Sequence, residues 1–416
     1  MKRILCLLCA CLLLTGCTSE SEPVSSNPSN GQDAPQLTVY SGDLNELKDM
    51  LNACPNFQCG DDLTVSVPET AKLYEFTVRE HHETNYEAFE ANYQALFQYI
   101  FPDREINQSN LHYVGSYTYD DDFEWGSTPL RLVSNYRAEL VSGALDYDGL
   151  GYDDPKDKIY CAIGSALDHG NALINRGVTQ RLTENEAKPD NFYPQDEYTY
   201  LKTVSPDSTE KVKLLNGETT VQDAVAAFSA YIDKMPYPKE QNVKTAVHSV
   251  EIYQVTSDAC GLLLRTTPEY SGLQNDYWSY SSYRGLIEYI YPLSYWAWMI
   301  ETDKPDEMMS YFRYRHLENV RSINKIADMQ TAVQTISDNL SAAVTFDVLQ
   351  IEFVYQQKYI PDENGHVDLK NGQPCTSRPV WKFTLQNPND TMMYVCWLDA
   401  ETASDFEYIC FSEDES

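Results

Sequence analysis

The chain has 416 residues, of which 42% are hydrophobic, and a formal net charge of −33 at pH 7. This length predicts two or three domains, and the hydrophobic content is typical of a folded globular protein. So large a negative charge excludes DNA, RNA and anionic lipid surfaces as partners, because each of them requires a cationic face.

The N-terminal residues are typical of a bacterial lipoprotein. Two basic residues precede an apolar run over residues 4–14, which has the length of a signal-peptide hydrophobic region and is too short to span a bilayer. The run ends in Leu-Thr-Gly-Cys at residues 14–17, which resembles the lipobox. This resemblance implies that residues 1–16 are a signal peptide and that Cys17 carries two or three acyl chains, palmitate among them, outside the cell. The alternative is an ordinary secretory signal in which Cys17 occurs by chance.

The segment after the lipobox, residues 17–36, is rich in Ser, Pro, Asn and Gly, and Val24 is its one large apolar residue before the folded part. Such a composition cannot bury enough apolar surface to offset the entropy lost on ordering. It predicts a disordered tether between the membrane and the folded domains.

The cysteines give little sign of a metal site. Cys54 and Cys59, in the segment ACPNFQCG, are close enough in sequence for a local disulfide. Cys161, Cys260 and Cys396 occupy apolar runs and are predicted to be small buried side chains. No spacing resembles a zinc site.

Three segments have helical periodicity and a start signal: residues 86–100, 221–234 and 329–342. Thr84 with Glu87, Thr219 with Gln222, and Asp328 are the expected caps. The expected buried stripes are Tyr86, Phe89, Tyr93, Phe97 and Ile100 in the first helix, Val221, Ala224, Val225, Phe228 and Ile232 in the second, and Met329, Ala332, Val333, Ile336 and Leu340 in the third.

Alternating apolar residues and turn sequences follow the second and third helices, and a looser version follows the first. The clearest alternation runs through Leu349, Ile351, Phe353 and Tyr355, with turn chemistry at residues 362–365. We therefore expect an α+β fold of repeated modules, each with one helix packed on a mainly antiparallel sheet. The expected divisions are an N-terminal domain over residues 37–205, a middle module over 206–315 and a C-terminal module over 316–416.

Two segments carry a resemblance to known modules. LLNGETTVQDAVAAFSAYI resembles the start, and PVWKFTLQNPNDTMMYVCWLDAETA the end, of extracytoplasmic PepSY-like modules and of the YycH/YycI-type proteins that regulate membrane histidine kinases. The match covers about residues 206–410 and departs at Ala403, where the family has Gly. The whole chain is also similar to uncharacterised lipoproteins of Gram-positive bacteria. The resemblance implies an interaction or regulatory role and brings no catalytic residues with it.

The most aromatic stretch of the chain is residues 275–305. Its second half predicts a β-hairpin, with Tyr295, Ala297 and Met299 on one face and Trp296, Trp298 and Ile300 on the other. The first half lacks burial periodicity and contains aromatic residues among Asn, Asp and Ser. These residues are the candidate site for a glycan or a peptide: Tyr277, Trp278, Tyr280 and Tyr283.

No motif of a known catalytic machinery is present: Gly-x-Ser-x-Gly, His-Glu-x-x-His and a Gly-rich phosphate loop are all missing. We therefore predict no catalytic residue, no metal site and no cofactor. An unrecognised hydrolase is the weakest alternative, since Ser208 and Lys211 fit Ser-x-x-Lys and Cys161 lies near His169. The acidic loop over residues 146–157 resembles a calcium loop but lacks its final Glu, so a solvated loop is favoured.

These observations predict a membrane-anchored extracytoplasmic lipoprotein that is not an enzyme. Its expected role is that of an interaction, regulatory or structural component of the cell envelope. The alternative is a surface lipoprotein that binds glycans or peptides. A partner in the envelope and the membrane itself, reached through the lipid on Cys17, are the expected contacts.

Overall fold

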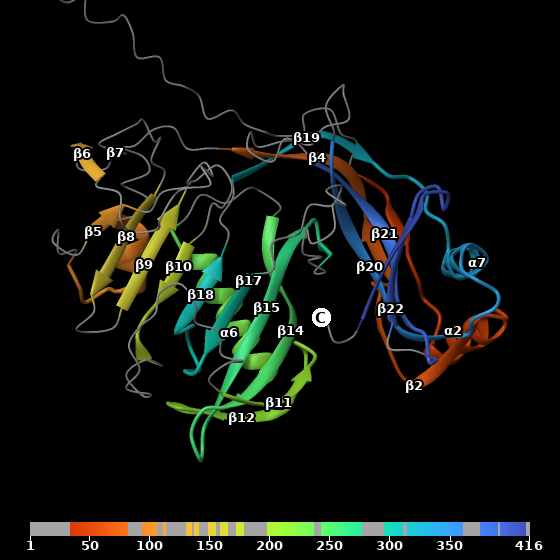
Figure 1. The fold of residues 1–416 in the computed structure, drawn as a ribbon, viewed down its shortest axis with the longest axis horizontal. Helices are drawn as coiled ribbons and strands as arrows, with labels where there is room; N and C mark the ends of the chain where they lie inside the picture. Colours follow the sequence, from red (N-terminus) through yellow and green to blue (C-terminus); the bar gives the residue numbers. More distant parts are fainter. Residues whose placement is uncertain are drawn as a thin grey trace, which may run out of the picture.

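The fold is α+β and consists mostly of β-sheet (Figure 1). In this computed structural model the described residues are 34–81, 94–105, 111–113, 130–134, 137–140, 149–154, 159–164, 172–178, 198–236, 243–276, 295–310, 314–360, 375–389 and 392–412. The helices in this part of the chain are α2 (Leu44–Asn52), α6 (Val221–Lys234), α7 (Met329–Asn339) and a helical segment at residues 94–100. None of the described helices is long and apolar enough to cross a membrane.

A ten-stranded antiparallel sheet forms one half of the molecule in space, on the left in Figure 1. Helix α6 covers one face of it, where Ala224 and Phe228 are buried together with Val250 and Leu262. In spatial order the strands are β11 (Thr199–Val204), β14 (Val243–Gln254), β15 (Cys260–Tyr270), β17 (Tyr295–Met299), β18 (Glu307–Ser310), β10 (Ala172–Asn175), β9 (Ile159–Gly164), β8 (Gly149–Asp154) and β5 (Leu111–Tyr113), and β16 (Leu273–Gln274) pairs with β15.

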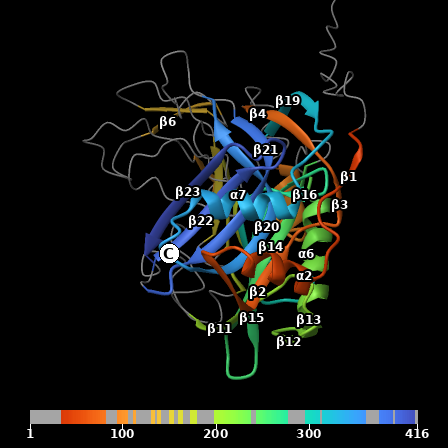
Figure 2. The same cartoon turned by 90° about the vertical axis from the view of Figure 1, so that its right-hand side faces the viewer.

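A seven-stranded sheet forms the other half, on the right in Figure 1. Helices α2 and α7 cover one face of it (Figure 2), and their Leu47, Leu51 and Ile336 are buried with Phe353 and Trp381 of the sheet. All pairs are antiparallel except β2 with β20, which is parallel. Its strands are β19 (Tyr314–Ser322), β4 (Tyr74–His81), β21 (Cys375–Gln386), β20 (Phe346–Tyr359), β2 (Phe57–Ser66), β22 (Met392–Asp399) and β23 (Phe406–Ser412).

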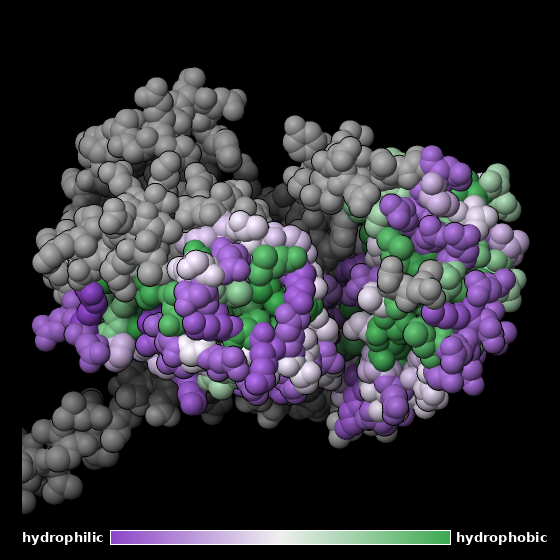
Figure 3. Space-filling model, turned by 90° about the horizontal axis from the view of Figure 1, so that it is seen from below, coloured by the Kyte–Doolittle hydropathy of each residue, from purple (hydrophilic) through white to green (hydrophobic). Residues whose placement is uncertain are grey.

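Three two-stranded pairs complete the described strands. They are β1 (Gln36–Thr38) with β3 (Thr70–Lys72), β12 (Lys211–Leu214) with β13 (Gly217–Thr220), and β6 (Leu130–Ser134) with β7 (Arg137–Leu140). Seen from below, hydrophilic residues predominate on the described surface of both halves, with smaller hydrophobic areas among them (Figure 3).

The expected domain over residues 37–205 does not form a unit of its own. Its strands β2 and β4 lie in the seven-stranded sheet, whereas β5, β8, β9, β10 and β11 lie in the ten-stranded sheet. The expected boundary at residue 316 also falls inside β19, which pairs with β4. The division at 205 therefore falls within the ten-stranded sheet, whereas the division at 315 lies within a few residues of the change of sheet between β18 and β19. Strand pairing across such distances leaves no local trace in periodicity or turn chemistry, which were the basis of the expected boundaries.

The helix predictions are confirmed where the structure describes them. Phe97 and Ile100 are buried, while Tyr86, Phe89 and Tyr93 lie outside the described residues. In α6 the cap is Thr220, whose hydroxyl accepts from Asp223 N at 3.1 Å, so the prediction of Thr219 was wrong by one residue. The stripe of α6 is buried at Val221, Ala224, Phe228 and Ile232 and half-buried at Val225.

Helix α7 begins at the expected cap, since Asp328 Oδ1 accepts from Thr331 N at 2.8 Å. It ends at Asn339, three residues before the predicted end at 342, and Leu340 becomes its C-cap. The remaining stripe residues are all buried: Met329, Ala332, Val333 and Ile336.

The hairpin expected in the aromatic stretch is confirmed as β17 and β18. Ala297 and Met299 belong to the core under α6, and Trp296, Trp298 and Ile300 to a second core on the opposite face. Trp298 is fully buried and its ring stacks on Tyr198, with ring centroids 5.6 Å apart. Gly261 faces this ring so closely that a Cβ atom there would lie 2.2 Å from it, so no larger residue fits without a shift of the tryptophan.

The disulfide expected between Cys54 and Cys59 is not formed. Cys54 is buried beside the end of α2, and its Sγ donates to Met50 O at 3.7 Å, whereas Cys59 lies in strand β2. Sequence proximity therefore did not bring these two thiols together. Cys161 and Cys396 are buried as predicted, and Cys260 is half-buried.

Candidate functional site

The two large sheets meet where the chain leaves β16. Residues 275 and 276 run beside β20: Asn275 forms a parallel bridge with Tyr355, and Asp276 N donates to Tyr355 O at 2.8 Å. Strand β21 occupies one edge of β20 from Asp347 to Tyr359. Residues 275 and 276 therefore lie on the opposite edge of β20, the edge with which β2 pairs near Ile351. The end of the ten-stranded sheet thus extends the seven-stranded sheet.

Charged side chains are buried at this junction. Lys382 Nζ lies 2.7 Å from Asp276 Oδ1 and 2.8 Å from Glu352 Oε2. Trp397 Nε1 donates to the second carboxylate oxygen, Asp276 Oδ2, at 2.7 Å. The side chains of Asp276, Glu352 and Lys382 are only 6%, 4% and 3% exposed. Together with His248, whose Nδ1 lies 3.9 Å from Glu352 Oε1, these residues form what we call the interface cluster.

Local strand geometry places each member of the interface cluster. Glu352, Lys382 and Trp397 are register partners on β20, β21 and β22, so their side chains form one row across the sheet. Neighbouring residues of β20 and β21, such as Phe353 and Trp381, belong to the core under α2 and α7, so the row lies on the face away from these helices. His248 comes from β14, at the register shift between Val247 and Ser249. A bulge of this kind re-aims a side chain.

The protonation states follow from burial and from the neighbouring charges. Burial alone would lower the pKa of Lys382, but the carboxylates of Asp276 and Glu352 raise it well above its ordinary value. Burial would raise the pKa of Glu352, yet Lys382 and His248 hold it below its ordinary value. Burial lowers the pKa of His248 more than Glu352 raises it. These directions keep Lys382 charged, Glu352 ionised and the imidazole of His248 neutral at pH 7.

This arrangement suits a structural lock better than catalysis. A lysine amine must be unprotonated to act as a nucleophile, and two buried carboxylates keep Lys382 charged. Removing one member of such a cluster leaves an uncompensated buried charge, which is strongly destabilising. Polar side-chain atoms of Asn275 and Gln356 are also buried close by in the sequence and have no hydrogen-bond partner within the described part of the chain.

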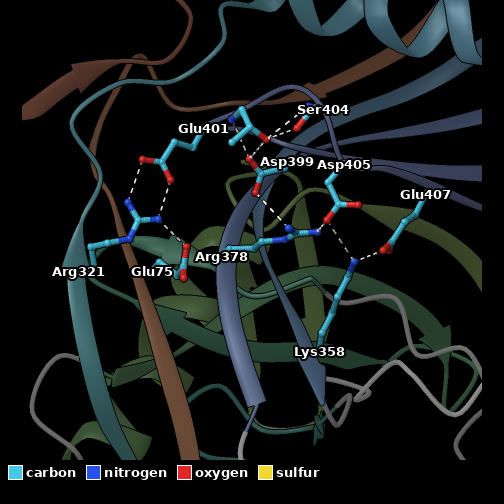
Figure 4. A network of polar contacts seen from close by, with 10 residues as sticks. Glu75, Arg321, Lys358, Arg378, Asp399, Glu401, Ser404, Asp405 and Glu407 are labelled. Carbon is cyan, nitrogen blue, oxygen red and sulfur yellow. Dashed lines mark hydrogen bonds and ion pairs between the residues drawn. The ribbon is translucent and has the colours of Figure 1, made fainter. Parts of the chain in front are cut away.

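A second group of charged residues is more exposed than the interface cluster (Figure 4). Arg321 contacts Glu75 and Glu401, each at 2.6 Å, and Arg378 contacts Asp399 at 3.3 Å. Arg378 also contacts Asp405, and Lys358 contacts Glu407. We call these residues the rim network: Glu75, Arg321, Lys358, Arg378, Asp399, Glu401, Asp405 and Glu407.

The rim network joins β4, β19, β20 and β21 to the end of β22, to β23 and to the turn between β22 and β23. Asp399 Oδ1 shapes this turn, because it accepts from Thr402 N at 2.8 Å and from the Thr402 hydroxyl at 2.7 Å. Ala403 then adopts a positive φ of 52°. Each of its three cations contacts two carboxylates of the same chain, so the network holds strands together.

None of the candidate residues chosen from the sequence belongs to the interface cluster or to the rim network. The lipidation candidate Cys17 and the aromatic candidates Tyr277, Trp278, Tyr280 and Tyr283 lie outside the described residues. The interface cluster was missed because Glu352 and Lys382 alternate with core residues and so resemble the solvent side of an amphipathic strand. A signal was present: their same-side neighbours Val354 and Val380 are apolar. Within the described residues, no group of three or more His, Cys, Asp or Glu is placed to hold a metal ion.

Comparison with known proteins adds a weak structural similarity. No protein-family model and no curated protein matches the chain. A crystal structure of an uncharacterized protein from Eubacterium rectale is similar, with a TM-score of 0.44 and 11% sequence identity. The similarity covers 89% of this chain and 96% of the other.

Proposed function

We propose that this chain is a lipoprotein anchored through Cys17 to the outer face of the cell membrane. We further propose that its folded part is a non-enzymatic interaction, regulatory or structural component of the envelope. The observation that carries the proposal is Leu-Thr-Gly-Cys at residues 14–17, directly after a short apolar run with a basic start. The polar segment that follows has the composition of a tether.

The two charged groups support a non-enzymatic role. The interface cluster uses its charges to hold residues 273–276 to the seven-stranded sheet, and the rim network does the same for six strands and a turn. A body braced in this way suits a protein that presents a fixed surface to a partner. The resemblance to PepSY-like and YycH/YycI-type modules points in the same direction, towards a partner at the membrane.

The proposal includes a relation between two modules. Apart from the two-residue β16, helix α6 is followed by β14, β15, β17 and β18, and α7 is followed by β20, β21, β22 and β23. In both cases the strands are neighbours in space in that same order. Both helices begin with a side-chain cap, and both bury their first residue and the residues three and seven positions after it. These parallels support repeated units of one helix and an antiparallel sheet.

The anchor is tested with Cys17→Ala and a matched control, Cys11→Ala, which replaces a cysteine inside the apolar run. Both variants are expressed in a Gram-positive host that is fed an alkyne fatty acid. We expect Cys17→Ala to lose the label and to appear in the medium or as unprocessed precursor, while Cys11→Ala behaves as wild type. A labelled, membrane-bound Cys17→Ala protein would show that the lipoprotein assignment is wrong.

A second candidate function is binding of a glycan or a peptide by Tyr277, Trp278, Tyr280 and Tyr283. Their sequence begins at the residue after Asp276, which three contacts fix at the junction of the sheets. We expect Trp278→Ala to change stability by less than about 1 kcal/mol, as surface substitutions do. The same variant should abolish retention on immobilised peptidoglycan fragments or peptides. Trp298→Ala is the contrasting control, because truncation of a buried tryptophan costs about 3–5 kcal/mol.

A further inference from the structure

The edges of the two large sheets differ in regularity. The pairing of β11 shifts between Tyr200 and Lys202, that of β19 between Glu318 and Arg321, and that of β2 between Cys59 and Thr64. Such irregularities interrupt the ladder and deter another strand from pairing. The far end of the ten-stranded sheet, β5, has only three residues. Strand β23 is different, since its register with β22 is unbroken from Met392↔Ser412 to Leu398↔Phe406.

The hydrogen-bond pattern shows which groups of β23 point away from its neighbour. Asp399 N donates to Asp405 O at 3.0 Å, and Asn387 N donates to Met392 O at 3.0 Å. Because bonded pairs alternate along an antiparallel ladder, even-numbered residues of β22 bond to β21 and odd-numbered ones to β23. The N–H and C=O groups of Phe406, Tyr408 and Cys410 therefore point outward. None of these groups has a backbone partner elsewhere in the described chain.

The side chains beside this edge favour contact with an added strand. Tyr408 is 53% exposed, and its ring centroid lies 6.2 Å from that of Tyr394 and 6.0 Å from that of Phe406. Tyr394 in turn packs on Phe346. The edge is held in place by the ion pair between Lys358 and Glu407. It thus combines a fixed row of outward backbone groups with an aromatic row on one face, as strand addition requires.

Charge selects the occupant of the edge. The rim network lies beside the start of β23 and has five carboxylates and three cations, so it is acidic as a group. The net charge of −33 on each copy opposes the pairing of two copies through this edge. A basic segment would instead be attracted to it.

We propose that β23 is a docking edge for an extended basic segment of a partner protein, which adds to the seven-stranded sheet as an eighth strand. The proposal rests on the interaction role proposed above and names the kind of partner. The lipid anchor is tested separately by Cys17→Ala, so the two can fail independently.

The test uses the full-length protein in detergent and a fluorescein-labelled peptide of alternating Val and Thr with Lys-Arg at each end. Fluorescence anisotropy should show binding that weakens at high salt, and the same peptide with Glu-Asp ends should bind at least about tenfold more weakly. Peptides N-methylated on one set of alternate residues should lose binding, whereas methylation of the other set should not, because only one edge of the added strand pairs with β23. Equal binding of the basic and acidic peptides, or equal effects of both methylation patterns, would overturn the proposal.

Two variants of β23 locate the binding. Cys410→Pro removes an outward N–H without touching the bonds to β22, and Cys410→Ser keeps that N–H. We expect Cys410→Pro to bind the basic peptide at least about tenfold more weakly than Cys410→Ser, with thermal unfolding unchanged between the two. Equal binding by both would place the peptide elsewhere. Sedimentation should show a monomer; a dimer that Cys410→Pro abolishes would make a second copy the occupant and overturn the choice of partner.

Discussion

The interface cluster and the rim network use the same chemistry in opposite surroundings. Lys382 in the first and Arg321 in the second each lie between two carboxylates, at distances of 2.6 to 2.8 Å. The side chain of Lys382 is 3% exposed, whereas that of Arg321 is 48% exposed. Water screens the exposed pair and solvates its members when it breaks, while a broken buried pair leaves a charge without compensation. Burial, more than contact distance, should therefore decide how much each group contributes to stability.

The largest expected effect is that of Lys382→Met, which leaves Asp276 and Glu352 buried without a cation. We expect it to lower the free energy of unfolding by about 3–5 kcal/mol in a urea titration. Lys202→Met is the matched control: Lys202 also pairs with a carboxylate, Glu210, at 2.7 Å, but its side chain is 50% exposed. The control should cost less than about 1 kcal/mol. Similar losses for both variants would refute the argument from burial.

The triple variant Lys382→Met, Asp276→Asn, Glu352→Gln sharpens the same point. It removes the buried charges together, so we expect it to be more stable than Lys382→Met alone. A triple variant that is less stable than the single one would mean that the carboxylates contribute through hydrogen bonds, such as that from Trp397, more than through charge.

The next effect concerns pH. The pKa of His248 in the folded protein lies below its ordinary value of 6.5, so the unfolded chain binds the extra proton first as pH falls below about 6.5. The pKa of Glu352 lies below 4.5, so a further loss should follow below about pH 4.5. Because both pKa values are lower in the folded protein, the free energy of unfolding is higher at neutral pH and falls on acidification. Unfolding midpoints measured between pH 8 and pH 3 should fall in two windows, and His248→Gln should remove the upper one only.

How much of this could be predicted from the sequence depended on how local the signal was. Helices α6 and α7 and the β17–β18 hairpin follow from caps, periodicity and turn residues within each segment. The pairing of Phe57 with Phe346 joins residues almost 300 positions apart and has no such signal. Glu352 and Lys382 occupy alternate positions that resemble a solvent-facing side, and the segment that covers them comes from the other sheet. The candidate site could therefore not be found without the tertiary structure.

Within the rim network, the turn at Ala403 offers a gain in stability. Ala403 has a φ of 52°, a region that costs an L-residue about 1–2 kcal/mol and that glycine adopts freely. Ala403→Gly should therefore stabilise the protein by about 1 kcal/mol after the greater entropy of glycine in the unfolded chain is allowed for. Ala226→Gly, at an exposed position in the middle of α6, should destabilise by a similar amount. Opposite signs in thermal unfolding are the expected outcome, and a loss at both positions would contradict it.

The smallest expected effect is that of Arg321→Gln in the exposed part of the rim network. Arg321 contacts Glu75 and Glu401 at 2.6 Å, as closely as Lys382 contacts its partners, but solvent reaches all three side chains. We expect a loss below about 1 kcal/mol that disappears near 1 M salt, since screening acts on exposed charges and little on buried ones. Arg378→Gln, whose parent side chain is 19% exposed, should fall between Arg321→Gln and Lys382→Met and keep part of its effect at high salt. A loss from Arg321→Gln that equals that from Lys382→Met, or that salt does not change, would show that contact geometry outweighs burial in this protein.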